Sequence, residues 1–330
     1  MNLETNASPA ESKIAESNLT DIDSLVTTIP IASPDFKSGF IAIVGRPNVG
    51  KSTLMNHLIG QKIAITSPVA QTTRNRLRGI LTTPEAQIIF VDTPGIHKPH
   101  HELGKVLVQN AKTAIKSVDL VLFVVDAASE AGTGDRFIFE ILKRIDTPVV
   151  LGLNKVDLQP ANCQFIDDTY ADLIAETNWS TVKFSATKGT GTEDLQQTLI
   201  GKLETGPYYY PPDLVTDQPE RFIIAELIRE QILLHTRQEI PHSVAITIEK
   251  IEELPKVTKV NAAINIERSS QKGILIGKKG SMLKTIGTDA RKQIQKLIAG
   301  KVHLELFVKV EPKWRQSRLR LAEFGYQVED

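Results

Sequence analysis

The sequence predicts an α/β protein in which a doubly wound parallel sheet is followed by a smaller α+β domain. Between residues 40 and 203, short apolar runs alternate with helical stretches, as strands and helices do in such sheets. A segment with four prolines and no hydrophobic period follows at residues 205–220. Beyond it the order of the predicted elements changes to helix, strand, strand, helix, strand. The 330 residues suffice for about two domains of ordinary size.

The first domain is predicted to span residues 37–204. Its expected strands are FIAIVG (40–45), QIIFVD (87–92), LVLFVVD (120–126), PVVLGLN (148–154) and a weaker TVKFS (181–185). These runs are apolar on both faces, which is typical of parallel strands covered by helices on both sides. Residues 1–36 are rich in Ser, Thr, Asn and acidic residues and have no amphipathic period, so we expect a disordered acidic tail there. The composition of this tail fits neither a secretory signal nor an organellar transit peptide.

The segment at 205–220 is predicted to be a linker, and the second domain to span residues 221–330. Three consecutive tyrosines in the linker either stack on nucleic-acid bases or pack the linker onto a domain. The expected elements of the second domain are a helix at 221–236, strands at 243–254 and 256–268, a helix from about 281 to 299, a strand at 302–310 and a basic closing helix at 312–325.

The composition bounds the class of protein. A hydrophobic content of 41% is enough for ordinary cores, and the single cysteine, Cys163, excludes a disulfide framework. No apolar run reaches the roughly 18 residues of a membrane span. The formal net charge is zero, but from Arg221 onward there are 20 Lys and Arg against 13 Asp and Glu. This basic part either meets a polyanion or presents a solvated lysine-rich surface.

A phosphate loop, GRPNVGKS, lies between the first expected strand and the next expected helix. Its pattern G-x-x-x-x-G-K-S/T places backbone N–H groups around phosphates at a helix N-terminus. Lys51 is expected to reach the β- and γ-phosphates, and the Ser52 hydroxyl to bind Mg²⁺. The residues predicted to surround the phosphates are Gly45, Arg46, Pro47, Asn48, Val49, Gly50, Lys51, Ser52 and Thr53.

Two further segments are expected to complete the phosphate and magnesium site. In DTPG, Asp92 ends a strand where the Mg²⁺ of a phosphate-loop enzyme is held, and the Gly95 N–H can meet the γ-phosphate. Thr93 and Pro94 lie between them. The polar stretch 70–76 is predicted to be a mobile loop whose threonine completes the Mg²⁺ shell. Thr73 is the preferred ligand and Thr72 the alternative.

The sequence NKVD selects guanine as the base. The Asp157 carboxylate can accept from the two adjacent N–H donors that guanine presents and adenine lacks, which should discriminate by about 10⁴-fold. Asn154 is expected to bond the purine edge and the Lys155 stem to cover the ring, with Val156 beside it. In the weaker signal SAT, the Ala186 N–H next to Ser185 could bond the guanine O6.

These motifs resemble those of the Era, TrmE and EngA group of GTPases. Many GTPases place a glutamine after DTPG, whereas this chain has Ile96, so no catalytic side chain is visible. Hydrolysis is therefore expected to rest on positioning and electrostatics from Lys51, Thr73, Gly95 and Asn48. The resemblance implies slow hydrolysis that is Mg²⁺-dependent and aided by K⁺ near Asn48. Alternatively, Asn48 serves only the fold of the loop.

A second glycine loop, GKKG within GILIGKKGSMLKTIG, has no hydroxyl residue after its lysines and does not fit a phosphate loop. A G-x-x-G between two helices beside a three-stranded sheet resembles the type II KH module. That resemblance implies a clamp on the backbone of about four single-stranded nucleotides. A glycine helix start with solvated lysines is the alternative. The residues expected to contact RNA are Gly273, Ile276, Gly277, Lys278, Lys279, Gly280, Lys284, Lys313, Trp314 and Arg315.

A GTPase followed by a KH module resembles the Era family from Phe40 to Tyr326, with further similarity in VKVEPKWR at 308–315. The resemblance implies a cytoplasmic, monomeric assembly factor for the small ribosomal subunit that binds GTP or GDP and single-stranded RNA near the 3′ end of 16S rRNA. It also implies peripheral contact with the plasma membrane. A membrane-surface signalling GTPase and a metabolic GTPase with an idle KH module are the competing hypotheses.

Overall fold

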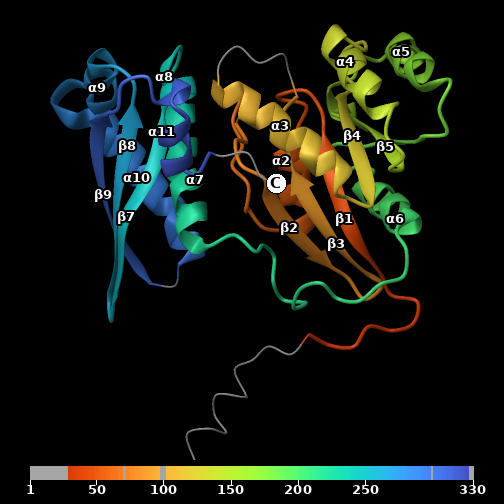
Figure 1. Cartoon of the computed structure of the whole chain (residues 1–330), viewed down its shortest axis with the longest axis horizontal. Coiled ribbons are helices and arrows are strands. Elements are labelled where there is room, and N and C mark those ends of the chain that lie inside the picture. Colours follow the sequence, from red (N-terminus) through yellow and green to blue (C-terminus); the bar gives the residue numbers. More distant parts are fainter. Residues whose placement is uncertain (1–28, 70–71, 97–101, 299, 327–330) are drawn as a thin grey trace, which may run out of the picture.

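The computed structural model describes residues 29–69, 72–96, 102–298 and 300–326. These residues form a six-stranded sheet and a three-stranded sheet in separate parts of the chain. Figure 1 shows the two parts side by side, joined by an extended linker along the lower side of the first part. The predicted order of a doubly wound domain followed by an α+β domain is confirmed. The predicted acidic tail lies outside the described residues as far as residue 28.

The six-stranded sheet has the order β2-β3-β1-β4-β5-β6. β2 pairs antiparallel with β3, and the other neighbours are parallel. The strands are β1 (Lys37–Val44), β2 (Leu77–Thr82), β3 (Ala86–Asp92), β4 (Leu120–Asp126), β5 (Val149–Asn154) and β6 (Ser180–Lys183). The helices that connect them are α2 (Lys51–Ile59), α3 (Glu102–Lys116), α4 (Thr133–Leu142), α5 (Gln164–Ile174) and α6 (Thr192–Lys202).

Each face of this sheet carries its own hydrophobic core. Because side chains alternate along a strand, Ile41 and Ile43 of β1 belong to one core, and Ala42 and Val44 belong to the other. Every residue of β3 and β5 is buried. This two-sided burial explains why the strand sequences are continuously apolar. It also brings the C-terminal ends of the parallel strands to one edge, where ligands bind in sheets of this kind.

The edge strand β2 was not predicted from the sequence. It contains Gly79, a residue that weakens the sequence signal of a strand. A Cβ at Gly79 would lie 2.3 Å from the Ile59 side chain, so the glycine lets β2 lie close to α2. The strand thus depends on packing against a distant helix, which no local pattern reveals.

The linker packs onto the first domain, which confirms the packing interpretation of its tyrosines. The ring of Tyr208 lies 4.2 Å from that of Phe36, and Tyr209 lies 5.2 Å from Phe40. The side chain of Gln87 accepts from the backbone N–H groups of both Tyr209 and Tyr210. Phe36 is only 2% exposed, so the assignment of residue 36 to a disordered tail was wrong.

The second domain is a three-stranded sheet of order β7-β8-β9 with helices packed on one side. β7 (Ala245–Leu254) and β8 (Val257–Ile266) are antiparallel, whereas β9 (Lys301–Val310) runs parallel to β8. The helices are α7 (Glu220–His235), α8 (Ile240–Ser243), α9 (Ser269–Ile276), α10 (Ser281–Leu297) and α11 (Arg318–Glu323). In Figure 1, α7 and α11 lie on the side that faces the first domain.

The predicted closing helix at 312–325 was wrong in extent. The structure has a short 3₁₀ turn at Trp314–Gln316 and a separate short helix, α11. Lys313 has a φ of 56°, which is incompatible with a continuous helix. The Ser317 side chain then accepts from the Arg320 N–H and caps the new helix start.

The two domains share a small apolar core. Leu103 and Leu107 of α3 pack with Ala245, Leu321 and the aromatic residues Trp314 and Tyr326. The contact joins the helix after DTPG to the C-terminal end of the second domain. Among the described residues, no helix has the length and apolar character needed to cross a bilayer.

Candidate nucleotide site and nucleic-acid interface

The loop between β1 and α2 wraps around the amino group of Lys51. Lys51 Nζ donates to the carbonyl oxygens of Gly45 at 3.2 Å and Arg46 at 3.0 Å. The Arg46 side chain points elsewhere and pairs with Asp135 of α4 at 2.7 Å. Gly50 has a φ of +99°, and a Cβ there would lie 2.3 Å from the Asn154 side chain. This tight turn places the loop N–H groups at the N-terminus of α2, as phosphate binding requires.

The ammonium group of Lys51 is buried and short of solvation. The residue is 6% exposed, and burial lowers its pKa to about 8, although the Asp92 carboxylate opposes this shift. A phosphate beside the ammonium would supply the stabilisation that water no longer provides. The site therefore favours an anion of high charge.

Three oxygens from three separate segments meet beside this lysine. Ser52 Oγ lies 2.6 Å from Asp92 Oδ2, Thr73 Oγ1 lies 3.0 Å from the same oxygen, and the two hydroxyls are 2.9 Å apart. Asp92 is fully buried, and burial raises its pKa, against the effects of Lys51 and the two hydroxyls. Its Oδ1 has no hydrogen-bond partner among the described residues.

This oxygen cluster fits Mg²⁺. The ion prefers octahedral oxygen ligands at about 2.1 Å, a geometry that spaces adjacent ligand oxygens by about 3.0 Å. The unpartnered Asp92 Oδ1 is a buried acceptor that a metal shell could satisfy. Ser52, Thr73 and Asp92 are therefore the residues that would hold the ion and, with it, the phosphates.

The structure places Thr72 and Thr73 in different surroundings. Thr73 Oγ1 reaches Asp92 and Ser52. Thr72 Oγ1 instead bonds within its own loop, to the Val69 carbonyl at 2.7 Å and the Ser67 hydroxyl at 3.1 Å. The position of the Thr73 hydroxyl favours Thr73 as the Mg²⁺ ligand, which is also the preferred choice from the sequence. The assignment of the ligand stays a prediction.

The DTPG segment lies against the phosphate loop. A Cβ on Gly95 would come within 2.7–2.9 Å of Pro47, so only glycine fits this approach. The Thr93 hydroxyl donates to the Ile43 carbonyl at 2.8 Å, and Pro94 is buried beside it. The Ile96 N–H donates to the Gly45 carbonyl at 3.3 Å and its side chain is 1% exposed. Ile96 therefore supplies no polar group for positioning water.

In the base-binding segment, Asn154 makes contacts that differ from those expected. Its Nδ2 donates to the Val49 carbonyl at 2.8 Å, and its Oδ1 accepts from the Ala186 N–H at 2.9 Å. In this structure the Ala186 N–H therefore faces Asn154 rather than a base. Asn154 is 2% exposed and braces the phosphate loop against the SAT segment. Sequence reasoning missed this role because an amide can bond a base or a backbone equally well.

The other base-binding candidates lie at the ends of β5 and β6. Lys155 has a φ of 69°, and its Nζ pairs with Asp126 at 2.6 Å, which fixes the stem at the end of β5. Val156 and Asp157 begin a 3₁₀ turn in which Asp157 is exposed. The Ser185 hydroxyl accepts from the Lys188 N–H at 3.1 Å and is held inside the SAT loop. The Asp157 carboxylate is exposed, and its role in reading the base stays a prediction.

A pocket of about 340 Å³ lies over the phosphate loop and reaches Lys155 of the base-binding segment. Lys51, Ser52, Thr73, Gly95 and Lys155 all line it. Sequence reasoning missed a further stretch of its wall, namely Ile65, Thr66, Ser67 and Pro68. That stretch carries no motif, and it reaches the pocket only because the loop after α2 folds back over the phosphate loop.

The second glycine loop has the backbone that its sequence predicts. Gly277 and Gly280 have φ values of 71° and 78°, a region that favours glycine. A Cβ on Gly277 would lie 2.7 Å from Met282 Cβ. Lys278 and Lys279 are exposed between the glycines, and α10 begins at Ser281. The loop therefore presents two cations at a helix N-terminus, which suits a phosphate backbone.

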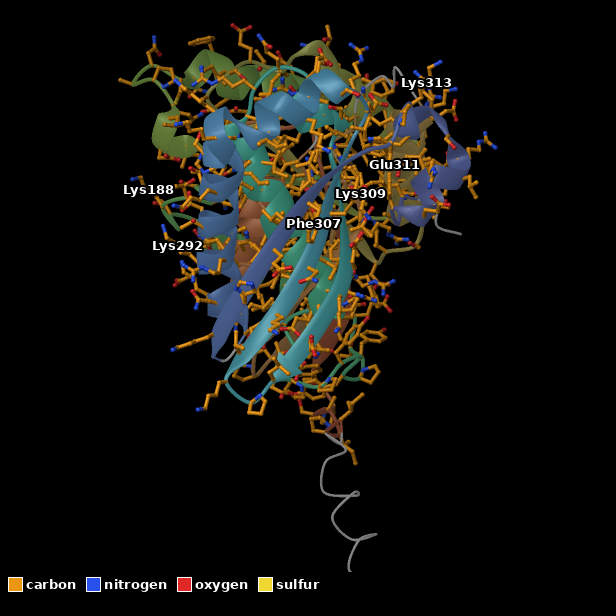
Figure 2. All side chains as sticks on the ribbon, turned by 90° about the vertical axis from the view of Figure 1, so that its left-hand side faces the viewer. Lys188, Lys292, Phe307, Lys309, Glu311 and Lys313 are labelled. Carbon is orange, nitrogen blue, oxygen red and sulfur yellow. The ribbon has the colours of Figure 1, made fainter. Side chains whose placement is uncertain are left out.

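A groove of about 480 Å³ continues from this loop between α10 and β9. Its wall includes Gly280, Lys284, Arg291, His303 and Leu306. The apolar GILI segment before the loop does not line this groove; it belongs to α9, where Leu275 is buried and Ile274 is exposed. Gly273 accepts the Gly277 N–H at the end of this helix, beside Ile276. Figure 2 shows Phe307, Lys309 and Lys313 following one another along β9 and the chain beyond it.

The prediction that Trp314 contacts RNA was wrong. The residue is fully buried, its Nε1 donates to the Ser243 carbonyl at 3.0 Å, and its ring stacks on Tyr326 at 5.8 Å. Arg315 is half-buried and pairs with Glu267. Lys313 is exposed. The central residue of the KWR sequence therefore has a structural role, because Trp314 belongs to the apolar core between the domains.

The fold and these two sites define a GTPase of the phosphate-loop class joined to a KH nucleic-acid-binding domain. Family models agree with this division, since "50S ribosome-binding GTPase" matches residues 40–155 and "KH domain" matches residues 239–315. The chain is 72% identical to GTPase Era of Crocosphaera subtropica over 305 residues, covering 92% of this chain and 97% of that protein. It is 68% identical to GTPase Era of Nostoc sp. over 323 residues, covering 97% and 99%.

Solved structures give the same result. Era in complex with MgGDPNP and nucleotides 1506–1542 of 16S ribosomal RNA has 40% identity and a TM-score of 0.85, covering 88% of this chain and 99% of that one. A variant of Aquifex aeolicus Era bound to GDP and aluminium fluoride has the same identity and TM-score, covering 88% and 100%. The chain belongs to the Era family of GTPases. It is a GTP hydrolase that uses Mg²⁺.

Proposed function

We propose that this protein is a GTP-dependent switch that binds the 3′ end of 16S rRNA and assists assembly of the small ribosomal subunit. The observation that carries the proposal is the Gly277–Gly280 loop, with two exposed lysines between left-handed glycines beside a groove. A structural relative at 40% identity contains 16S ribosomal RNA together with a nucleotide. The basic charge of the second domain is consistent with the same partner.

In the proposed nucleotide site, Lys51 neutralises the phosphates, and Ser52, Thr73 and Asp92 hold Mg²⁺, which supplies Lewis-acid stabilisation of the phosphate charge. The proposed role of the Gly95 N–H is to meet the γ-phosphate, and its close approach to Pro47 of the phosphate loop supports this role. Because Ile96 is apolar and buried, the site works through fixed positions and charge rather than through a side-chain base. Asp157 reads guanine.

RNA crosslinking tests the proposed partner. We expect the purified chain, with a non-hydrolysable GTP analogue, to enrich the 3′ end of 16S rRNA over the rest of total bacterial RNA. Gly280→Asp should reduce that binding by about 100-fold or more, because a carboxylate would face the RNA phosphates and an L side chain would strain the loop. GTP hydrolysis without RNA serves as the folding control. A diffuse RNA map, unchanged in Gly280→Asp, would refute the RNA role.

We further propose that K⁺ accelerates hydrolysis at Asn48. The Asn48 Nδ2 donates to the Pro68 carbonyl at 2.9 Å, which leaves its Oδ1 to face a cation near the phosphates. Replacing K⁺ by Na⁺ at constant ionic strength should slow hydrolysis about tenfold, as the loss of one electrostatic stabiliser would. Phosphate release measures the rate. Equal rates in the two salts would leave Asn48 with the loop contact as its only role.

Peripheral membrane contact and a cytoplasmic location stay predictions. The basic segment 312–325 could meet lipid through the short helix α11, in which Leu319 is the large apolar residue that is exposed. A helix of this length buries little apolar area in a membrane surface. Sedimentation with anionic vesicles, in the presence and absence of the RNA fragment, would show whether lipid and RNA bind to the same surface of the second domain.

A further inference from the structure

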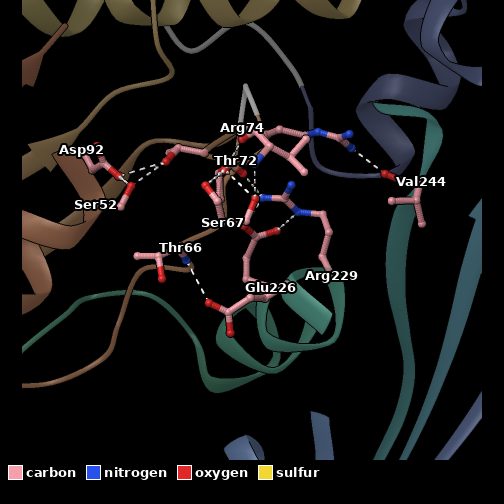
Figure 3. Close-up of polar contacts among 12 residues, drawn as sticks. Ser52, Thr66, Ser67, Thr72, Arg74, Asp92, Glu226, Arg229 and Val244 are labelled. Atoms are coloured by element: carbon pink, nitrogen blue, oxygen red, sulfur yellow. Dashed lines mark hydrogen bonds and ion pairs between the residues drawn. The ribbon is translucent and has the colours of Figure 1, made fainter. Parts of the chain in front are cut away.

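The loop that carries Thr73 is held from its other side by the second domain. Figure 3 shows this loop between helix α7 and the oxygen cluster that includes Ser52 and Asp92. At its start, the Thr66 N–H donates to Glu230 Oε1 at 2.9 Å, while Glu230 Oε2 pairs with Lys62 at 2.6 Å. Glu230 is 1% exposed and comes from α7. The contact therefore joins an element of the RNA-binding domain to the wall of the nucleotide pocket.

Arg229, the neighbour of Glu230 on α7, reaches the residue before Thr73. Its Nη2 donates to the Thr72 carbonyl oxygen. The guanidinium is oriented by Glu226, which accepts from Nε at 2.8 Å and from Nη2 at 2.6 Å. Arg229 is fully buried, and its bidentate ion pair with Glu226 fixes the orientation of the guanidinium.

Arg74, the residue after Thr73, inserts into a socket formed by the second domain. Its Nη1 donates to the Val244 carbonyl at 2.5 Å, and its Nη2 donates to the carbonyls of Pro241 at 3.0 Å and His242 at 3.2 Å. The guanidinium also lies 6.0 Å from the Trp314 ring and 5.7 Å from the Tyr326 ring. The residue is 4% exposed. Carbonyls at the end of α8 and two aromatic faces together suit a cation.

We propose that Arg74 and Arg229 are positioning residues of the GTPase site. The second domain holds the residue before Thr73 through its carbonyl and the residue after it through its side chain. Thr73 lies between these two attachments, and its hydroxyl meets Asp92 and Ser52. The second domain thus holds Thr73 in place at the magnesium site. The conformation that binds the triphosphate is the one in which Arg74 occupies its socket in the second domain. The two events are thermodynamically coupled. A ligand that displaces the second domain from the first therefore weakens triphosphate binding, and the bound triphosphate stabilises the contact between the domains.

Charge-conserving substitutions test the assignment, which rests on the proposed role of Thr73. Lysine at either position keeps the positive charge but lacks the planar guanidinium, whose several N–H groups can donate to more than one acceptor at once. We expect Arg74→Lys and Arg229→Lys to weaken Mg²⁺-dependent binding of a non-hydrolysable GTP analogue about tenfold, with GDP affinity changed less than about twofold. Arg318→Ala is the matched control, because it removes an ion pair with Glu102 at 3.8 Å between the domains but outside this loop.

Equilibrium binding with a fluorescent nucleotide, with Mg²⁺ and with EDTA, gives these affinities. Retention of the wild-type ratio of triphosphate to diphosphate affinity in both folded lysine variants would overturn the proposal. If the variants do not fold, hydrogen exchange of the wild-type chain decides. The segments 226–232 and 239–246 should exchange more slowly with the Mg²⁺-bound triphosphate analogue than with GDP, and equal exchange would overturn it. RNA is absent from both measurements, so a failure of the proposed RNA role would not imitate their outcome.

Discussion

Lys51→Ala is expected to lower GTP turnover by at least about 100-fold, because it removes a fixed donor to the developing phosphate charge. The structure explains why no neighbour compensates. Lys51 is buried beneath the loop, its Nζ is held by the Gly45 and Arg46 carbonyls, and its pKa is lowered to about 8 by that burial. The Asp92 carboxylate interacts electrostatically with Lys51 and would repel the phosphates if it faced them without the lysine.

Single-turnover phosphate release and nucleotide affinity measure this effect. Lys143→Ala provides a control, since Lys143 makes an ion pair with Glu176 at 2.7 Å on the first domain, away from the pocket. Turnover by Lys51→Ala at the wild-type rate would show that the phosphate loop is not the hydrolytic site.

We expect Asp157→Asn to change the preferred base from guanine to xanthine. In the proposed role the carboxylate would accept two N–H bonds from guanine, whereas an asparagine amide would present a donor that the C2 oxygen of xanthine can accept. Losing one of these two hydrogen bonds should lower GTP affinity by about 10⁴-fold, and the new amide donor should confer binding to xanthosine triphosphate. Asp157 is exposed in its 3₁₀ turn, so the substitution should leave the fold intact.

Competition between the two triphosphates measures this exchange. Asp168→Asn is a suitable control, because Asp168 lies on α5 and accepts from Gln164 at 2.8 Å. If Asp157→Asn still preferred GTP by the wild-type factor, the base would have to be read by another group.

The sequence predicted the parts of the fold and site that depend on local pattern. The strands before the phosphate loop, DTPG and NKVD are continuous apolar runs, and each motif follows its strand directly. β2 was missed because Gly79 interrupts its signal, and the closing helix was overextended because the positive φ of Lys313 has no sequence marker.

The remaining differences arise from contacts between distant segments. Trp314 in a basic stretch looks like a nucleic-acid contact, but Tyr326 and the first-domain residue Leu103 bury it. Arg229 looks like the polar side of an amphipathic helix, yet it bonds a carbonyl 157 positions away. Burial of this kind is decided by how the domains meet, and no periodicity or motif encodes that arrangement.

The anchored linker has a consequence for how the domains separate. The linker is fixed to the first domain by the Ile80–Val215 hydrogen bond and by the Arg78–Asp217 ion pair, and α7 begins at Glu220, directly after it. A tether this short keeps the socket of the second domain at a local concentration of roughly millimolar or higher around Arg74 of the first domain. Opening and closing are therefore unimolecular events that dilution does not affect. Individually weak contacts suffice to keep the domains closed, and a ligand can separate them only by binding the open form more tightly.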